Sequence, residues 1–198
     1  MFAKPILYRS LIDPLLSSVR DGVLRNITPD ETVIDIACGN GTLALEIASI
    51  AKDVTAIDLD EEMIAYAITR KTRLTTTNIT FTTADASDLS GFAGRQFATA
   101  VTTMAIHQFD PAVAQKVLSE MKRVSHRVII ADYNIPLPGN MAGLIASGLE
   151  RLAGGDHHRN FCNFRAKGGL SHFTGSAGLT LRSSEVRGAG VFVVAVFE

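Results

Sequence analysis

The stretch VIDIACGNGTLALEIA, residues 33–48, decides the fold of this chain. Its first part is apolar except for Asp35, and it continues through the turn Gly39-Asn40-Gly41 into apolar residues at helical spacing. This order predicts a strand, a tight turn and a helix. Glycine accepts positive φ and has no Cβ, so a ligand can approach the backbone closely at this turn. Free N–H groups at the start of the helix favour an anionic or carboxylate-bearing ligand.

The length and composition of the chain exclude several classes of protein. With 198 residues and 46% hydrophobic residues, it suits one domain with a sizeable core. No apolar run reaches the roughly 18 residues of a membrane-spanning helix, and charged residues and Pro5 interrupt the amino-terminal segment, unlike a signal peptide. We therefore expect a cytoplasmic protein without stable membrane insertion. The net charge of −1 and the lack of a dense basic run argue against a nucleic acid partner.

Strand and helix patterns alternate along most of the chain. A helical pattern over 10–24 precedes the first strand, and DVTAIDLD (53–60) with the helix 61–74 forms a second unit. This alternation predicts an α/β fold with a doubly wound, seven-stranded, mostly parallel sheet of Rossmann-like type and helices on both faces. The last two strands are joined only by residues 187–190, so we expect an antiparallel carboxyl-terminal hairpin. The segment 136–167 is the least regular. Later strands are expected in ITFTTADAS (79–87), QFATAVTTM (96–104) and RVIIADY (127–133), with a helix over 111–124.

Three acidic residues end successive predicted strands and should meet at one edge of the sheet. They are Asp35, Asp58 and Asp85, and Asp58 follows the glycines at about the distance typical of a ribose-binding carboxylate. Residues 39–44, GNGTLA, also fit G-x-G-x-x-A, so an NAD-dependent oxidoreductase is an alternative. However, a pyrophosphate would meet Asp35 as a like charge, whereas this residue would attract the ammonium of an aminocarboxylate. A ligand with an amino acid end, a ribose and an adenine suits the whole set.

These motifs resemble those of the class I S-adenosylmethionine-dependent methyltransferases. DIACGNG (35–41) is similar to the first motif of that family, AIDLDEEMIAYA (56–67) to its ribose-binding motif and TADASDL (83–89) to its adenine-flanking segment. The resemblance covers about residues 30–198 and is closest to the small-molecule methyltransferases of the ubiquinone and menaquinone biosynthesis type. It implies a single methyltransferase domain over 1–198, with an amino-terminal helical segment over 1–29.

The resemblance implies S-adenosyl-L-methionine as the cofactor and a set of residues around it. Two positions depart from the family pattern, since Ala37 replaces a common glycine and Ala98 replaces the usual acid of the fourth strand. Neither change is expected to abolish cofactor binding, because the methyl group of Ala37 is small and Ala98 lies far from the strand end that faces the cofactor. The implied cofactor-binding residues are Asp35, Ala37, Gly39, Gly41, Asp58, Leu59, Asp85, Ala86 and Thr103.

The methyl acceptor is expected to be a small organic molecule that is methylated at oxygen, nitrogen or carbon. His107 follows the fourth strand and is either a general base or a structural loop histidine, while Tyr133 ends the fifth strand at the functional edge or anchors its turn. His157 lies in the segment 136–167, which forms either a substrate lid with a general base or a solvated basic face. The candidate catalytic residues are thus His107, His157 and Tyr133.

Several absences narrow the chemistry further. The motifs of DNA-base methyltransferases, a cysteine trio for arsenic and the acidic set of a catechol-type magnesium site are all missing, so no metal is expected. The sequence leaves a homodimer open. It also leaves a non-catalytic S-adenosylmethionine-binding module as a second alternative, because such a protein would keep the same cofactor motifs.

Overall fold

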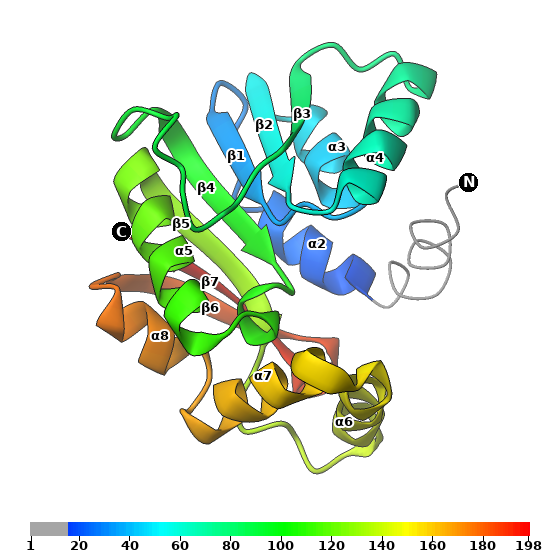
Figure 1. Ribbon diagram of the computed structural model, residues 1–198, viewed down its shortest axis with the longest axis vertical. Coiled ribbons are helices and arrows are strands. Elements are labelled where there is room, and N and C mark those ends of the chain that lie inside the picture. Colours follow the sequence, from blue (N-terminus) through cyan, green and yellow to red (C-terminus); the bar gives the residue numbers. More distant parts are fainter. Residues whose placement is uncertain (1–15) are drawn as a thin grey trace.

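Seven strands form one mixed sheet in the computed structural model, which describes residues 16–198. The strand order is β3-β2-β1-β4-β5-β7-β6 (Figure 1). Neighbouring strands from β3 to β5 are parallel, whereas β7 is antiparallel to both β5 and β6. This order confirms the predicted fold and its antiparallel hairpin. The strands are β1 (Thr32–Ile36), β2 (Asp53–Asp58), β3 (Ile79–Thr83), β4 (Phe97–Thr103), β5 (Ser125–Tyr133), β6 (Leu181–Arg187) and β7 (Phe192–Phe197).

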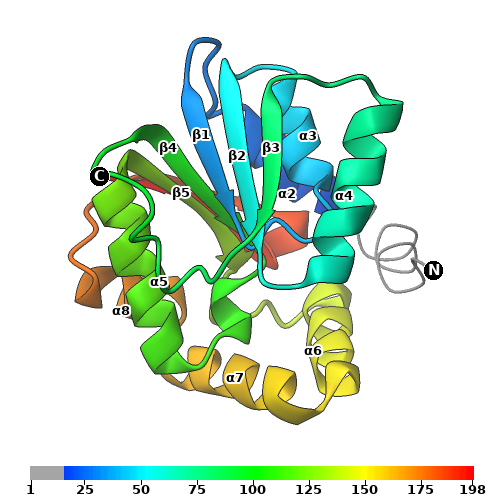
Figure 2. The same cartoon turned by 45° about the horizontal axis from the view of Figure 1, so that its top comes forward.

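Helices cover both faces of this sheet, as the alternating pattern predicts (Figure 2). The chain moves outward from β1 to β3, returns to the centre at β4 and then moves the other way, so right-handed crossovers place α3 and α4 on one face and α5 on the other. α2 packs against β6 and β7 and contacts α3. The α-helices are α2 (Ser17–Leu24), α3 (Thr42–Ala48), α4 (Glu61–Arg73), α5 (Pro111–Val124), α6 (Met141–Ala153), α7 (Gly155–Ala166) and α8 (Leu170–Ser176), and two 3₁₀ turns are η2 (Ile106–Gln108) and η3 (Gly188–Gly190).

The central strands are apolar on both faces because helices cover both. Ile34 and Ile36 of β1 and Val101 of β4 are completely buried. Polar residues mark where the helices begin. Asp60 accepts hydrogen bonds from two backbone N–H groups at the start of α4, and Asp110 caps α5 just before a proline.

Polar contacts tie the strands together at their amino ends. Arg127, which is half-buried on β5, donates hydrogen bonds to Glu31 at 2.7 Å and to the Thr99 hydroxyl at 3.0 Å. The Asn78 side-chain amide donates to the carbonyls of Ala48 at 2.9 Å and Ala51 at 3.0 Å. These contacts connect β1, β4 and β5, and they fix the end of α3 to the start of β3.

The segment after β5 differs from the sequence prediction. We expected irregular structure over 136–167, but most of it forms α6 and α7. The helical signals were present, since Asn140 caps α6 by accepting from the N–H of Gly143, and apolar residues recur along the helix at spacings of three and four. The predicted helix 10–24 is described only from Ser17 onward. The part of the amino-terminal segment that contains Tyr8, which could close over a cofactor or pack as a first helix, lies outside the described residues.

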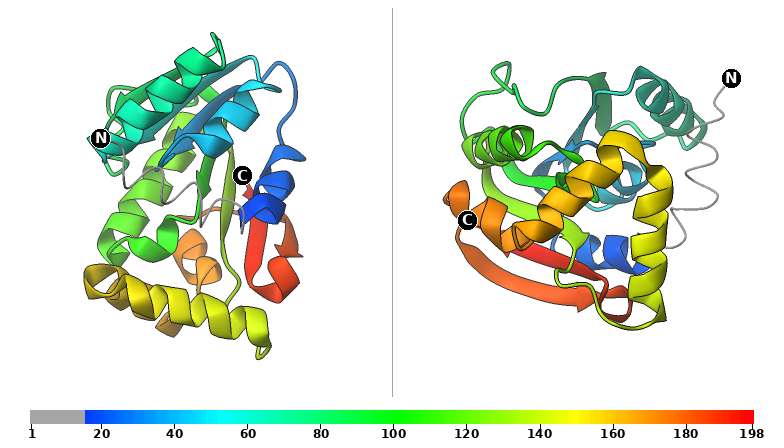
Figure 3. Two further views of the ribbon diagram at one scale, coloured as in Figure 1. Left: turned by 90° about the vertical axis from the view of Figure 1, so that its right-hand side faces the viewer. Right: turned by 60° about the horizontal axis from the view of Figure 1, so that its bottom comes forward.

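The carboxyl ends of β1, β2, β4 and β5 point toward one edge of the molecule, where η2, α6 and α7 also lie (Figures 1 and 2). The two views of Figure 3 show α6 and α7 following one another along this edge. In open α/β sheets, ligands bind beyond the carboxyl ends of the strands where the strand order reverses, here between β1 and β4. Within residues 16–198, no helix combines the length and the apolar character that crossing a bilayer requires.

Candidate functional site

The loop between β1 and α3 has the open backbone that its glycines predict. Ala37, Gly39 and Gly41 all have positive φ, at 58°, 55° and 74°. A Cβ added at Gly39 would meet nothing within 4 Å, so the loop is open to a ligand there. At Gly41 a Cβ would lie 2.8 Å from the Phe81 ring, and this glycine instead lets α3 pack closely against the sheet. Gly41 is not among the residues that line the pocket described next, and its implied cofactor contact stays a prediction.

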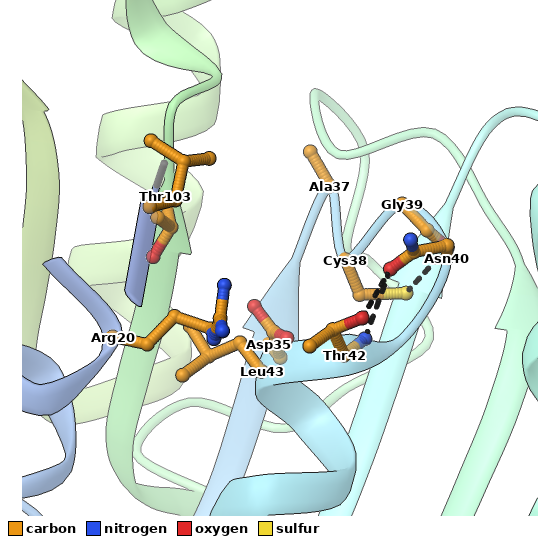
Figure 4. A pocket seen from close by; sticks show the side chains of 10 residues that line it. Arg20, Asp35, Ala37, Cys38, Gly39, Asn40, Thr42, Leu43 and Thr103 are labelled. Atoms are coloured by element: carbon orange, nitrogen blue, oxygen red, sulfur yellow. Dashed lines mark hydrogen bonds between the residues drawn. The ribbon is translucent and has the colours of Figure 1, made fainter. Parts of the chain in front are cut away.

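A small pocket lies between this loop, the end of β4 and α2 (Figure 4). Asp35 and Thr103 line it, together with Arg20, which comes from α2. Within the described chain, Oδ2 of Asp35 and Oγ1 of Thr103 are buried and have no hydrogen-bond partner. Two orphaned polar atoms facing one pocket indicate a site built for a polar ligand.

Burial, followed by the nearby charge of Asp58, raises the pKa of Asp35 to about 8. Burial, followed by the nearby charges of Asp35 and Asp58, raises the pKa of the Cys38 thiol. A thiol with a raised pKa is a poor nucleophile. Cys38 is therefore a half-buried residue of the loop that packs against the core.

Asp58 lies beside the loop, at the end of β2. Its carboxylate accepts hydrogen bonds from the backbone N–H of Gly39 at 2.7 Å and of Asp60 at 2.9 Å. A carboxylate offers about four acceptor positions, so further hydroxyl groups can bind there. The next residue, Leu59, is 72% exposed and presents apolar surface at the same edge.

The end of β3 comes close to the end of β2, because the Ala84 N–H donates to the Asp58 carbonyl at 3.0 Å. Asp85 is exposed and accepts a hydrogen bond from the Ser87 N–H at 2.8 Å, while Ala86 is half-buried. The structure thus places Asp35, Asp58 and Asp85 on the ends of neighbouring strands, in the predicted order.

A second cavity of about 370 Å³ adjoins the small pocket, and Leu16 lines both. Apolar side chains from α6, β7 and the end of β4 form most of its wall. All three candidate catalytic residues, His107, Tyr133 and His157, line it together with Glu150. The apolar lining residues are Leu16, Met104, Leu149, Leu152, Ala153 and Phe192.

The three candidate catalytic side chains converge on the carboxylate of Glu150. The Tyr133 hydroxyl donates to Oε1 of Glu150 at 2.7 Å, and Nε2 of His157 lies 2.6 Å from Oε2. Nε2 of His107 lies 3.6 Å from Oε1. His107, Tyr133 and Glu150 are buried, whereas the side chain of His157 is 31% exposed.

Asp132 fixes His107 from the other side. Its Oδ1 lies 2.6 Å from Nδ1 of His107, and its Oδ2 accepts from the His107 backbone N–H at 3.2 Å. Burial opposes a charge on His107, but Asp132 and Glu150 outweigh it and raise the pKa of His107 to about 9. Burial likewise opposes ionisation of Glu150, yet hydrogen bonds from His107 and His157 lower its pKa.

Neither Glu150 nor Asp132 was predicted as a site residue from the sequence. The sequence signal for Glu150 lies within α6, whose buried positions are Gly143, Ala146 and Glu150, at a spacing of three and four. Glu150 is the single acidic residue on a helix face that otherwise carries small residues, and this pattern sets it apart from the exposed acids of the chain. Asn160 holds α7 beside this site by donating to the carbonyl of Gln108 at 2.8 Å.

Comparison with known proteins agrees with this geometry. A family model described as a methyltransferase domain matches residues 33–127. A demethylmenaquinone methyltransferase from Beutenbergia cavernae is 32% identical over 111 residues, which are 54% of this chain and 43% of that protein. The chain spans less than half the length of the curated relatives that it matches.

Solved structures share the fold at low sequence identity. A SAM-dependent methyltransferase from Aquifex aeolicus has a TM-score of 0.72 at 18% identity, over 98% of this chain and 97% of that one. Magnesium protoporphyrin IX methyltransferase from Synechocystis, solved with bound SAH, has a TM-score of 0.59 at 18% identity, over 98% and 82%. The match over residues 33–127 and the shared fold confirm the resemblance to class I S-adenosylmethionine-dependent methyltransferases that the sequence indicates.

Proposed function

We propose that this protein is an S-adenosylmethionine-dependent methyltransferase that transfers a methyl group to oxygen, nitrogen or carbon of a small organic acceptor. The observation that carries the proposal is the buried Asp35 carboxyl group, whose Oδ2 faces the pocket without a partner in the described chain. A cationic ammonium group that donates hydrogen bonds supplies what this carboxyl group lacks. The amino acid end of S-adenosylmethionine has such a group.

The residues around the pocket fit the rest of this cofactor. Gly39 and Ala37 would lie against its methionine part, with the Thr103 hydroxyl as a second polar contact. Asp58 retains acceptor capacity for the two ribose hydroxyls, and Leu59 offers exposed apolar surface to the adenine ring. Asp85 and Ala86 would flank the adenine. When bound, the cofactor supplies a methyl group already activated by a sulfonium sulfur, so the protein has to position the acceptor.

The cavity beside the pocket is the proposed acceptor site. Its volume of about 370 Å³ and its mostly apolar wall suit a small organic molecule. The name of the Beutenbergia cavernae relative, a demethylmenaquinone methyltransferase, supports an acceptor of this class. His107, Tyr133 and His157 would contact or orient the acceptor there. The α6–α7 segment would act as the substrate lid proposed for residues 136–167.

We further propose that the protein acts in the cytoplasm, without a nucleic acid partner and without stable membrane insertion. The net charge of −1 supports the absence of a nucleic acid partner. A homodimer remains a prediction, which size-exclusion chromatography with light scattering tests directly.

Calorimetric titration with S-adenosylmethionine, S-adenosylhomocysteine and NAD tests the cofactor. We expect micromolar binding of the first two and none of NAD. Binding of NAD alone would support the oxidoreductase alternative and overturn the proposal. Binding of S-adenosylmethionine without transfer to any acceptor in a screen of phenols, amines and activated carbon acids would favour the non-catalytic binding module.

A further inference from the structure

Three potential metal ligands from separate elements face one point in the acceptor cavity. His107 comes from η2, Glu150 from α6 and His157 from α7. One ligand atom of each lies within 4.8 Å of the other two. The three residues are 43 and 7 positions apart, so only the fold brings them together.

We propose that His107, Glu150 and His157 bind one divalent transition-metal ion, with zinc as the representative ion. Two imidazole nitrogens and one carboxylate oxygen form a donor set that zinc and ferrous iron use in proteins. Such a set of three leaves at least one coordination position for a further ligand. Because all three residues line the cavity, that ligand would come from the cavity.

The contact between Asp132 and Nδ1 of His107 leaves Nε2 of the same ring available as a metal ligand. A carboxylate only accepts hydrogen bonds, so the 2.6 Å contact requires a proton on Nδ1 of His107. In a neutral ring, Nε2 then carries a lone pair and faces another acceptor, Oε1 of Glu150, at 3.6 Å. A cation between the two atoms satisfies both. Carboxylate contacts of this kind orient metal-binding histidines in many proteins.

The spacing of the ligand atoms suits a metal after a small adjustment. Neighbouring ligand atoms of a tetrahedral zinc site, with bonds of about 2.0–2.1 Å, lie about 3.3 Å apart. The 3.6 Å between Nε2 of His107 and Oε1 of Glu150 is close to this value, whereas the 2.6 Å between Nε2 of His157 and the other carboxylate oxygen, Oε2, has to widen by less than about 1 Å. His157 can make this movement because its side chain is 31% exposed and lies in the first turn of α7, just after two glycines with positive φ.

A proton on Nε2 of His107 is the competing occupant of this position. Because Asp132 and Glu150 favour the charged ring, a doubly protonated His107 would also hold the cluster together. The two occupants give different results in a binding experiment. If a proton occupies this position, no metal is needed there, and the affinity for zinc does not depend on Glu150 or His157.

The metal would also narrow the acceptor class, an extension that rests on the proposed function. A metal with an open position binds an oxygen and lowers the pKa of a hydroxyl group, which favours a phenol or an enol as the acceptor. In the transfer, the hydroxyl proton leaves to solvent and the oxygen lone pair forms the new O–C bond. The bonding pair of the broken S–C bond stays on sulfur.

Zinc binding to the chelator-treated full chain tests the site. We expect one zinc per chain by calorimetry and elemental analysis, and at least a tenfold weaker affinity in His157→Ala and Glu150→Gln. Asp132→Asn should weaken zinc binding about 10- to 100-fold through His107. His172→Ala is the matched control, because His172 is exposed on α8 and should retain full affinity. Circular dichroism and S-adenosylmethionine binding verify that each variant is folded.

Substoichiometric zinc, or unchanged affinity in Glu150→Gln and His157→Ala, would overturn the metal site. So would nuclear magnetic resonance showing protons on both nitrogens of the His107 ring in the presence of zinc. Zinc affinity is measured without S-adenosylmethionine, so failure of the cofactor titration leaves this result interpretable. With Co²⁺ as the probe, phenol should shift the visible absorption and toluene should not. Equal spectra with both would reject the hydroxyl acceptor while keeping the metal.

Discussion

Replacement of Asp35 by asparagine should stabilise the ligand-free protein and remove cofactor binding. The pKa of Asp35 is raised from 3.8 to about 8, mainly by burial and then by Asp58. The unfolded chain therefore releases this proton near pH 4, and the folded protein keeps it until near pH 8. The free energy of unfolding falls as the pH rises between these values, because the folded state binds the extra proton. Asparagine has no titratable proton, so the free energy of unfolding of the variant does not fall with pH for this reason.

The size of the effect follows from the distance between the solution pH and the ordinary pKa of aspartate. At pH 7, about three pH units above 3.8, the penalty is about 4 kcal/mol at 1.36 kcal/mol per unit. At pH 5 it is below about 2 kcal/mol by the same relation. We expect Asp35→Asn to exceed the wild type in stability by these amounts, provided that the polar atoms of the amide are no worse paired than those of a protonated carboxyl group.

Urea unfolding followed by circular dichroism at pH 5 and pH 7 measures the difference. Asp85→Asn is the matched control, because Asp85 is exposed and its cap on Ser87 survives the change. Calorimetry in two buffers of different ionisation enthalpy should show that the wild type releases about one proton on binding S-adenosylmethionine at pH 7. The stability difference between Asp35→Asn and the wild type should be larger at pH 7 than at pH 5. An equal or smaller difference at pH 7 would refute a buried Asp35 that stays protonated.

Three further substitutions test other parts of the molecule. Asp58→Ala should weaken S-adenosylmethionine binding by about 1–3 kcal/mol in calorimetry, because the ribose hydroxyls lose a charged acceptor, and unchanged affinity would refute that contact. Gly41→Ala should lower the free energy of unfolding by about 1–3 kcal/mol, since its Cβ would collide with Phe81 at a positive φ, and a neutral effect in urea unfolding would contradict the close packing. Asn78→Ala should lower it by about 1–3 kcal/mol while cofactor affinity stays unchanged, because two carbonyls at the end of α3 lose their donor. A loss of affinity in Asn78→Ala would show that the two ends of the strands are coupled.

The sequence predicted those parts of the fold whose signals lie within short segments of the chain. A glycine turn directly after a buried strand and an acid at the end of each following strand are read within short windows, and parallel pairing brings their ends to one edge. For this reason the placement of Asp35 and Asp58 at one edge of the sheet could be predicted. Gly41 shows the limit of the approach, because the same glycine signal arises whether the missing Cβ makes room for a ligand or for Phe81.

The contacts of the proposed acceptor cavity could not be predicted in the same way. Glu150 is polar on a helix that exposes Met141, Leu144 and Leu152, so its helix has no simple apolar face against the core. Its role depends on His107 and His157, which reach it from other elements. Such long-range contacts depend on how α6 and α7 pack at the end of the sheet, and no periodicity within one window records that packing.

The α6–α7 pair also determines how this protein could be engineered. These helices supply Leu149, Glu150, Leu152, Ala153 and His157 to the wall of the cavity, whereas the small pocket is lined by residues that precede Met104. The two sets of residues can therefore be varied independently. A directed-evolution library confined to exposed and cavity-lining positions of 141–157, with Glu150 and His157 kept, would explore new acceptors on a cofactor site that is left intact.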